Sequence, residues 1–183
     1  MGQIMYVISI DVGTKNLAYC MLEKNEQGNI TIQNWSVCEL PCVATNIPKV
    51  TGFLRSLLPI DKDITDVVIE KQPARNVKMR LMENTLTTFF VMLDVPRVVN
   101  YSSKHKLGNI GKTAKGKTNY SLRKKMGVAM CGTYLKDHNE SQEYMSLFNA
   151  SKKKDDLADC LLQGLSYMGF NINSLSDTCV CNV

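Results

Sequence analysis

Four acidic residues stand at the ends of expected strands and helices, and their chemistry is that of a metal site. Asp11 follows the apolar run YVISI and precedes a glycine-containing turn, and Glu70 ends the apolar run ITDVVI. Asp156 and Asp159 are three residues apart in SKKKDDLADC, a spacing that puts them on one face of a helix. Mg²⁺ prefers carboxylate oxygens, and a pair of such ions can clamp the attacking and leaving oxygens of a phosphoryl displacement. Converging acids therefore predict metal-dependent cleavage of a phosphodiester.

Each of these acids has an ordinary explanation when it is taken alone. Aspartate before glycine is a common turn former, Glu70 can pair with Lys71, and Asp155 and Asp156 can simply be solvated. The ordinary explanation is the better one for each residue singly. Two strand-end acids together with an Asp-x-x-Asp helix favour a site.

The positive charge of the chain is concentrated in one segment. Residues 95–136 hold ten lysines and arginines and no acid, whereas the other 141 residues hold 12 basic and 17 acidic side chains. A cationic surface on an acidic body indicates a polyanionic partner, most simply nucleic acid. The alternative is a solvated lysine loop, and the complete segregation of charge favours binding.

Hydrophobic periodicity predicts an α/β domain with a central mixed sheet of five strands flanked by helices. The first three strands are expected to form an antiparallel meander, followed by two parallel strands. We expect strands at 4–11, 16–24, 29–39, 64–70 and 96–102, and helices at 45–58, 76–93, 119–136, 140–149 and 152–168. Residues 1–170 are expected to form a single domain, and the polar segment 171–183 a disordered tail.

Residues 111–118, GKTAKGKT, match the phosphate-loop pattern of P-loop NTPases. Such a loop leaves a buried strand directly, but nine polar-biased residues separate Tyr101 from Gly111. No later apolar run ends in an aspartate suited to hold a nucleotide's Mg²⁺. We therefore expect no nucleotide cofactor, and the NTPase interpretation is the weaker one.

Composition favours an intracellular protein in a reducing compartment. The chain has seven cysteines, an odd number, scattered through apolar runs rather than arranged as a disulfide framework. No apolar stretch approaches the ~18 residues of a membrane span, and no cleavable leader is apparent before the first expected strand. We expect neither secretion nor association with a membrane.

Three segments carry a family resemblance. SIDVGTKNLAYC resembles the first strand of the RuvC-type branch of the RNase H-like superfamily, where the aspartate is catalytic. VVIEKQPARN resembles its second acidic strand, and KKKDDLADCLLQG is similar to its closing helix with two metal-binding acids. These motifs are most similar to those of the poxvirus-type and fungal mitochondrial Holliday junction resolvases, and the resemblance spans roughly residues 6–168. The resemblance implies an RNase H-like fold and an endonuclease that makes paired nicks in four-way DNA junctions.

The resemblance also assigns roles to residues. Asp11, Glu70, Asp156 and Asp159 become a catalytic set that binds two Mg²⁺ ions, which Mn²⁺ is expected to replace, and Asp155 is a reserve ligand. Which of Lys152–Lys154 approaches the scissile phosphate stays open. The expected DNA-binding residues are Lys15, Asn16, Lys71, Gln72, Arg75, Lys104, Lys106, Lys112, Lys115, Lys117, Arg123, Lys124, Lys152, Lys153 and Lys154.

The same family implies a homodimer, with the helix at 76–93 as the contact. That helix has a broad face rich in Met and Phe, and an interface and a core contact explain this face equally well. Tyr101 and Tyr120 flank the basic segment and are expected either to stack on a base or to pack in the core. The remaining alternatives are another RNase H-like nuclease, acting on RNA:DNA hybrids or other branched DNA, and a non-catalytic DNA-binding domain.

Overall fold

The computed structural model describes residues 3–40, 46–57, 63–102, 120–138 and 140–175. Its strands are β1 (Met5–Asp11), β2 (Asn16–Lys24), β3 (Ile30–Glu39), β4 (Asp66–Glu70) and β5 (Arg97–Tyr101). Its helices are α1 (Ile47–Leu57), α2 (Val77–Val91), α3 (Tyr120–Asp137), α4 (Gln142–Ala150) and α5 (Lys154–Tyr167). These elements match the predicted ones in type and order, with ends that differ by a few residues.

One mixed sheet in the order β3-β2-β1-β4-β5 forms the centre of the molecule. β1, β2 and β3 pair antiparallel, while β4 lies parallel to both β1 and β5. The predicted meander with two added parallel strands is therefore confirmed. β1 is the strand where the antiparallel and parallel parts of the sheet meet.

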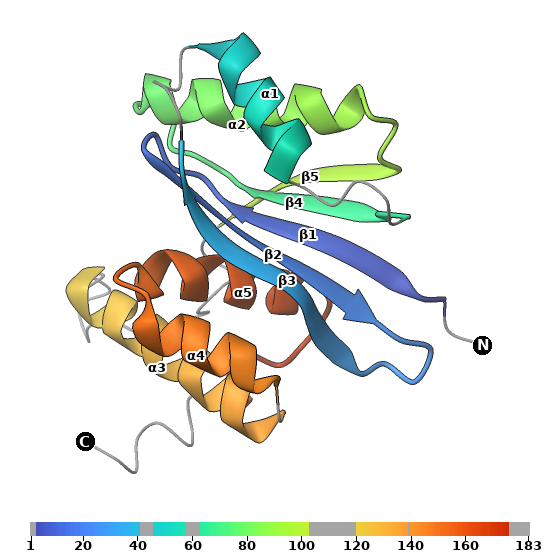
Figure 1. The fold of residues 1–183 in the computed structure, drawn as a ribbon, viewed down its shortest axis with the longest axis vertical. Helices are drawn as coiled ribbons and strands as arrows, with labels where there is room; N and C mark the ends of the chain where they lie inside the picture. The colour runs from blue at the N-terminus through green and yellow to red at the C-terminus, as the bar shows by residue number, and fades with distance from the viewer. Residues whose placement is uncertain (1–2, 41–45, 58–62, 103–119, 139, 176–183) are drawn as a thin grey trace.

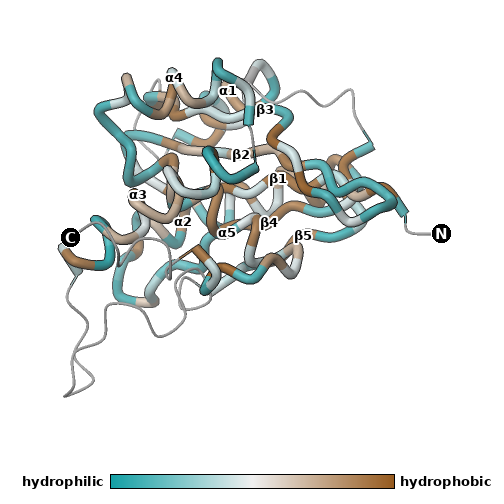
Figure 2. The backbone as a smooth tube through the Cα atoms, turned by 90° about the horizontal axis from the view of Figure 1, so that it is seen from below, coloured by the Kyte–Doolittle hydropathy of each residue, from teal (hydrophilic) through white to brown (hydrophobic). Residues whose placement is uncertain are grey.

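Helices cover both faces of the sheet, so the molecule has three layers. In Figure 1, α1 and α2 lie on one side of the strands, and α3, α4 and α5 lie on the other. Each face has its own hydrophobic core, one packed around Trp35 and Leu161 under α5 and the other around Ile69 and Phe90 under α2. The hydrophobic stretches, brown in Figure 2, include parts of β4 and α5.

Alternation along β1 decides which way its terminal acid faces. Ile8 and Ile10 belong to the core on the α2 side, and Val7 belongs to the core on the α5 side. Ser9 also faces α5, because it contacts Gln163 of that helix. Successive side chains of a strand point to opposite faces, so Asp11 lies on the α5 side.

β4 follows the same rule. Val67 and Ile69 pack toward α2, and Val68 packs toward α5. By alternation Glu70 also points to the α5 side. The two strand-end acids therefore share a face of the sheet.

The broad apolar face of α2 is turned into the core. Met82, Leu86, Phe89 and Phe90 are all buried against the sheet. The exposed apolar side chains of this helix region are instead at its ends: Val77, Val91 and Met92. The Met- and Phe-rich face that the sequence offered as an interface is thus explained by core packing.

The first residues of the expected C-terminal tail pack against the domain. Ile172 and Leu175 are buried members of the core under α5. The packed part of the chain therefore extends beyond residue 170, at least to Leu175, while residues 176–183 lie outside the described part. Within the described residues, no helix is long and apolar enough to span a membrane.

α5 lies unusually close to the sheet at Gly164. A Cβ added at this glycine would lie 2.6 Å from Leu22 Cδ1 and 3.0 Å from Ser9 Cβ. Both distances are shorter than ordinary van der Waals contact, so the helix can approach β1 and β2 this closely only without a side chain here. Gly164 therefore allows the helix that carries Asp156 and Asp159 to pack this close to β1 and β2.

We expect Gly164→Ala to lower the free energy of unfolding by about 1–3 kcal/mol, because the added methyl overpacks the contact with Ser9 and Leu22. Gly132→Ala in α3 is the matched control, since its nearest neighbour, Phe148 Cε1, would be 4.0 Å from the new Cβ. That variant should be neutral or gain up to ~1 kcal/mol from helix propensity. Urea unfolding measures both. Equal effects at the two positions would contradict the close-packing argument.

Candidate active site

A hollow of about 540 Å³ lies at the carboxyl ends of β1 and β4, beside the start of α5. All four predicted acids line it: Asp11 from β1, Glu70 from β4, and Asp156 and Asp159 from α5. The other residues that line it are Val12, Lys71, Gln72, Pro73, Asn76, Met79, Tyr120, Arg123 and Lys124. Side chains separated by almost 150 positions in the sequence thus share one concave surface.

The parallel pairing of β1 with β4 sets the first two acids side by side. Ile10 is the register partner of Ile69, so Asp11 and Glu70 each follow directly after a paired residue. Parallel neighbours are about 4.8 Å apart, and both side chains leave the same face. The turn after Asp11 depends on Gly13, where an added Cβ would be only 2.0 Å from the carbonyl oxygen of Asn16.

The other two acids are brought in by α5. The sequence predicted a helix from residue 152, which puts lysines in its first turn, but the helix begins at Lys154. Asp155 and Asp156 therefore occupy the first turn, where the helix dipole favours negative charge. Asp159 lies three residues further along, on the same side as Asp156.

Gln163 ties α5 to both acid-bearing strands. Its side-chain nitrogen donates to the carbonyl oxygens of Ile10, at 3.0 Å, and Val68, at 3.2 Å, and also lies 3.2 Å from Ser9 Oγ. The side chain is fully buried. Sequence reasoning missed this residue, although a glutamine inside an apolar helical run was a detectable signal.

Asp155, the reserve ligand, is held by a lysine. Lys124 Nζ of α3 donates a short hydrogen bond to Asp155 Oδ2. Burial raises the pKa of Asp155, but the hydrogen bond and charge of Lys124 outweigh it, so the pKa is lowered overall. The same bond raises the pKa of Lys124. Asp156, not Asp155, lines the hollow.

The predicted DNA-binding residues fall into three groups. Lys71, Gln72, Arg123 and Lys124 line the hollow. Those with positions in the structure away from its lining are Lys15, Asn16, Arg75, Lys152, Lys153 and Lys154. Those in the segment 103–119, outside the described residues, are Lys104, Lys106, Lys112, Lys115 and Lys117. The phosphate-loop pattern at 111–118 lies outside the described residues as well.

Two of the three lysines at the start of α5, Lys153 and Lys154, have identifiable neighbours. Lys153 Nζ lies 3.8 Å from Asp156 Oδ2. Lys154 Nζ lies 5.9 Å from the centre of the Phe148 ring on α4, a cation–π arrangement. Of these two lysines, Lys153 is the one that contacts a residue lining the hollow, Asp156.

The two tyrosines that flank the basic segment differ in their surroundings. Tyr101 is partly buried, with its hydroxyl 3.1 Å from Ser166 Oγ and its ring edge-on to Tyr167. Tyr120 lines the hollow, is 71% exposed, and has Lys124 Nζ 5.2 Å from its ring centre. Tyr101 is thus explained by packing, whereas Tyr120 offers an open aromatic surface.

The hollow suits a hard cation in its donor chemistry. Its described lining contains four carboxylates and neither cysteine nor histidine. Within the described residues, however, no three Asp, Glu, His or Cys side chains are gathered closely enough to count as a metal cluster. The fit to Mg²⁺ therefore rests on ligand type and a shared surface.

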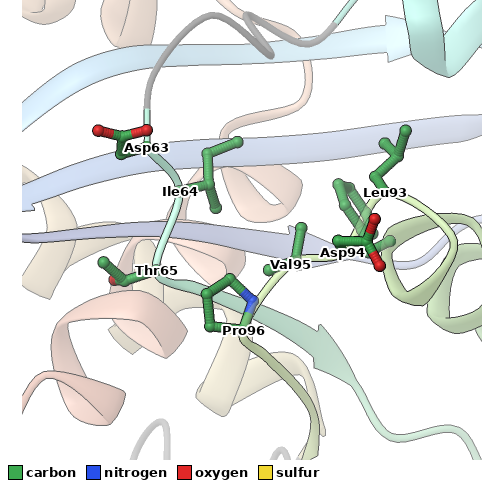
Figure 3. Close-up of a pocket in the computed structure, with 8 residues that line it drawn as sticks. Asp63, Ile64, Thr65, Leu93, Asp94, Val95 and Pro96 are labelled. Atoms are coloured by element: carbon green, nitrogen blue, oxygen red, sulfur yellow. The ribbon is translucent and has the colours of Figure 1, made fainter.

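A second hollow, of about 340 Å³, lies at the opposite end of β4 (Figure 3). It is lined by residues preceding β4 and β5, among them Asp63 and Asp94, whose carboxylates lie apart in the view. Among the residues that the structure describes, no lysine or arginine lines it. Of these two hollows, as far as their described linings show, the first combines acids from three elements with basic side chains and the second does not.

The fold is similar to that of solved Holliday junction resolvases. The yeast mitochondrial Holliday junction resolvase Ydc2 has a TM-score of 0.66 and 20% identity, covering 94% of this chain and 82% of that one. Fowlpox virus resolvase, in a complex with substrate Holliday junction DNA, also has 0.66 and 20%, covering 90% and 97%. Thermus thermophilus RuvC has 0.61 and 15%, covering 95% and 98%.

The chain belongs to the Poxvirus A22 protein family, whose model matches residues 5–173. It is also 34% identical over 126 residues to the uncharacterized protein L451 of Acanthamoeba polyphaga mimivirus. The match covers 58% of this chain and 29% of that relative, so the chain spans less than a third of the relative's length. The predicted family resemblance is confirmed.

We expect Asp155→Asn to lower the free energy of unfolding at pH 7 by less than about 1 kcal/mol, because the pair with Lys124 is partly exposed. The pKa of Asp155 is lowered in the folded protein, so its contribution is present above its unfolded pKa and is lost as the pH falls through the folded value. Urea unfolding at pH 7 and about pH 3, with the exposed Asp137→Asn as control, measures this. A difference from wild type that grew on acidification would contradict the ion pair.

Proposed function

We propose that this protein is a Mg²⁺-dependent endonuclease that resolves four-way DNA junctions by paired, symmetric nicks. The observation that carries the proposal is the shared hollow, where carboxylates from β1, β4 and α5 stand beside Lys71, Arg123 and Lys124. Membership of the Poxvirus A22 protein family and an RNase H-like resolvase fold support it. Yeast mitochondrial Ydc2 and the fowlpox virus protein, which share this fold, are Holliday junction resolvases.

In this proposal the four acids hold the metal ions. Carboxylates facing one hollow repel one another, and a divalent cation removes that repulsion while using their oxygens as ligands. Two bound Mg²⁺ ions would supply an activated water for in-line attack and stabilise the leaving 3′ oxygen. Asp11, Glu70, Asp156 and Asp159 orient the ions, and Mn²⁺ is expected to substitute.

Basic and aromatic side chains at the hollow bind the DNA in this proposal. Lys71 and Arg123 neutralise phosphates next to the scissile one, so affinity should fall steeply as the salt concentration rises. Tyr120 offers its exposed ring to an unpaired base at the crossover. The predicted lysines of segment 103–119 would extend the same cationic track along the junction arms.

We expect symmetric cuts in a labelled four-way junction with Mg²⁺ and none with EDTA. Asp11→Asn and Asp159→Asn should each reduce the rate roughly a hundredfold or more, because loss of even an outer-shell metal partner costs about 10- to 100-fold. Gel analysis of single-turnover reactions measures the rates. A matched duplex and an RNA:DNA hybrid serve as competing substrates.

Asp63→Asn is the matched control, because this acid lines the second hollow, at the other end of β4. It should cut at the wild-type rate. Preferential cutting of the hybrid would assign the protein to another nuclease activity of the same fold class. Junction binding without any cutting would favour a non-catalytic DNA-binding domain.

The proposed enzyme acts as a homodimer through the exposed side of α2. The apolar side chains available there are Val77, Val91 and Met92, and Met92 is 75% exposed. A second copy of this chain is the proposed occupant because paired nicks require two active sites, one for each opposed strand. The buried Met and Phe face of α2 makes no part of this contact.

We expect wild type to sediment as a dimer at micromolar concentration and the double variant Val91→Glu/Met92→Glu to sediment as a monomer. Charge on both chains at a two-fold contact would repel and also cost desolvation. Ile4→Glu, at an exposed apolar residue outside α2, is the control and should stay dimeric. A wild type that is monomeric at this concentration would contradict the contact.

A further inference from the structure

Glu83 is a buried carboxylate for which neither metal binding nor DNA binding accounts. It lies in the middle of α2 with 1% of its surface exposed, and it does not line the hollow. Its Oε2 accepts a hydrogen bond from the backbone nitrogen of Gln72, at 3.0 Å, and lies 3.6 Å from Arg80 Nη1. A buried charge is costly unless it is paired in this way, so its contacts indicate what it is for.

Gln72 continues the connection to the hollow. Only 7% of this residue is exposed, and its side-chain nitrogen donates to Glu70 Oε2 and to the Glu70 carbonyl oxygen, both at 3.1 Å. The amide therefore bridges the side chain and the backbone of the same residue. The sequence suggested that Gln72 contacts DNA. The hydrogen bonds described for Gln72 are instead to Glu70 and Glu83.

The two contacts form one chain of hydrogen bonds from α2 to Glu70. Glu83 fixes the backbone of Gln72 just after β4 ends, and the fixed Gln72 then holds the Glu70 carboxylate. Without such a partner, a glutamate side chain keeps three rotatable bonds and loses their freedom when it binds a ligand. When Gln72 already holds the Glu70 side chain in the ligand-free protein, the conformational entropy is lost during folding and no longer weakens ligand binding.

We infer that Gln72 and Glu83 are positioning residues that orient the Glu70 carboxylate toward the hollow. The inference rests on the proposed function in one respect, that Glu70 holds a metal ion. It adds a specific claim: Gln72 acts through its amide hydrogen, and Glu83 acts as a hydrogen-bond acceptor and not through its charge.

The variants separate these roles. Gln72→Met keeps the length of the side chain and removes the donor to Glu70. Glu83→Gln keeps an oxygen that can accept from the Gln72 backbone, whereas Glu83→Leu removes it. Gln33→Met is the matched control, since the Gln33 amide bonds Thr31 on β3, distant from the hollow in the sheet order.

Three measurements are made on the full chain: Mn²⁺ affinity by calorimetry without DNA, the melting temperature, and a metal-free crystal structure of Gln72→Met. We expect Gln72→Met to bind Mn²⁺ about tenfold more weakly, with a nearly unchanged melting temperature and a displaced Glu70 side chain. Glu83→Gln and Gln33→Met should bind as wild type does. Glu83→Leu should weaken Mn²⁺ binding and also lower the melting temperature. Because that loss of stability can itself weaken binding, the inference is tested by Gln72→Met.

Wild-type Mn²⁺ affinity in Gln72→Met, or a Glu70 side chain that keeps its position in that crystal, would overturn the inference. Glu83→Gln binding as weakly as Glu83→Leu would overturn the claim that Glu83 acts as an acceptor. The proposed function fails separately, if wild type does not cut four-way junctions. In that case a displaced Glu70 in metal-free Gln72→Met would still support the positioning role.

Discussion

The site depends on the close packing of α5 against β1 and β4. The first two acids belong to strands and the other two to a helix, so nothing in local sequence brings the pairs together. Gly164 lets the helix backbone approach Ser9, and the Gln163 amide bonds carbonyls of both strands. Burying the amide nitrogen would be unfavourable without these acceptors, so the bonds favour this position of the helix, although the amide oxygen has no hydrogen-bond partner among the described residues. This position directs Asp156 and Asp159 to the hollow that Asp11 and Glu70 already line.

Electrostatics at the hollow oppose stability and favour ligand binding. Four carboxylates line one concave surface, where like charges repel one another, and Lys71, Arg123 and Lys124 line the same surface. Lys124 is occupied with Asp155, which does not line the hollow, and Lys153 approaches Asp156 at 3.8 Å. α5 also begins without a side-chain cap, so its first turn relies on Asp155, Asp156 and tertiary packing. A site built in this way gains most from a cation, which is what the proposed chemistry requires.

Much of the fold could be predicted from the sequence, since the periodicity of the strands and the ends of their apolar runs are local signals. Asp11 and Glu70 were singled out for the same reason, since each ends an apolar strand, whereas Asp156 and Asp159 were singled out by their spacing of three residues in a helix. Gln72 was expected to contact DNA, but its bonds to Glu70 and the burial of Glu83 could not be predicted, because a polar residue in a turn or helix is expected to be exposed until the packing of α2 is known. The Met and Phe face of α2 had two equal explanations, and only the position of the sheet decided for the core. Gln163 could have been noticed, but its acceptors lie about 100 and 150 residues away.

The two halves of the site are held by different kinds of interaction, and this bears on how the fold persists at 20% identity or less to its solved relatives. Asp11 and Glu70 are set side by side by backbone pairing of β1 with β4, which many apolar side chains can support. The relative position of these two acids depends little on which apolar residues fill the strands. The helical acids depend instead on side-chain contacts, at Gln163 and Gly164, and on the ion pair at the start of α5. Sequence change in the sheet should therefore leave the strand acids in register, whereas change beneath α5 alters the distance between the two pairs. The helix, not the sheet, is where the geometry of this site is most easily adjusted.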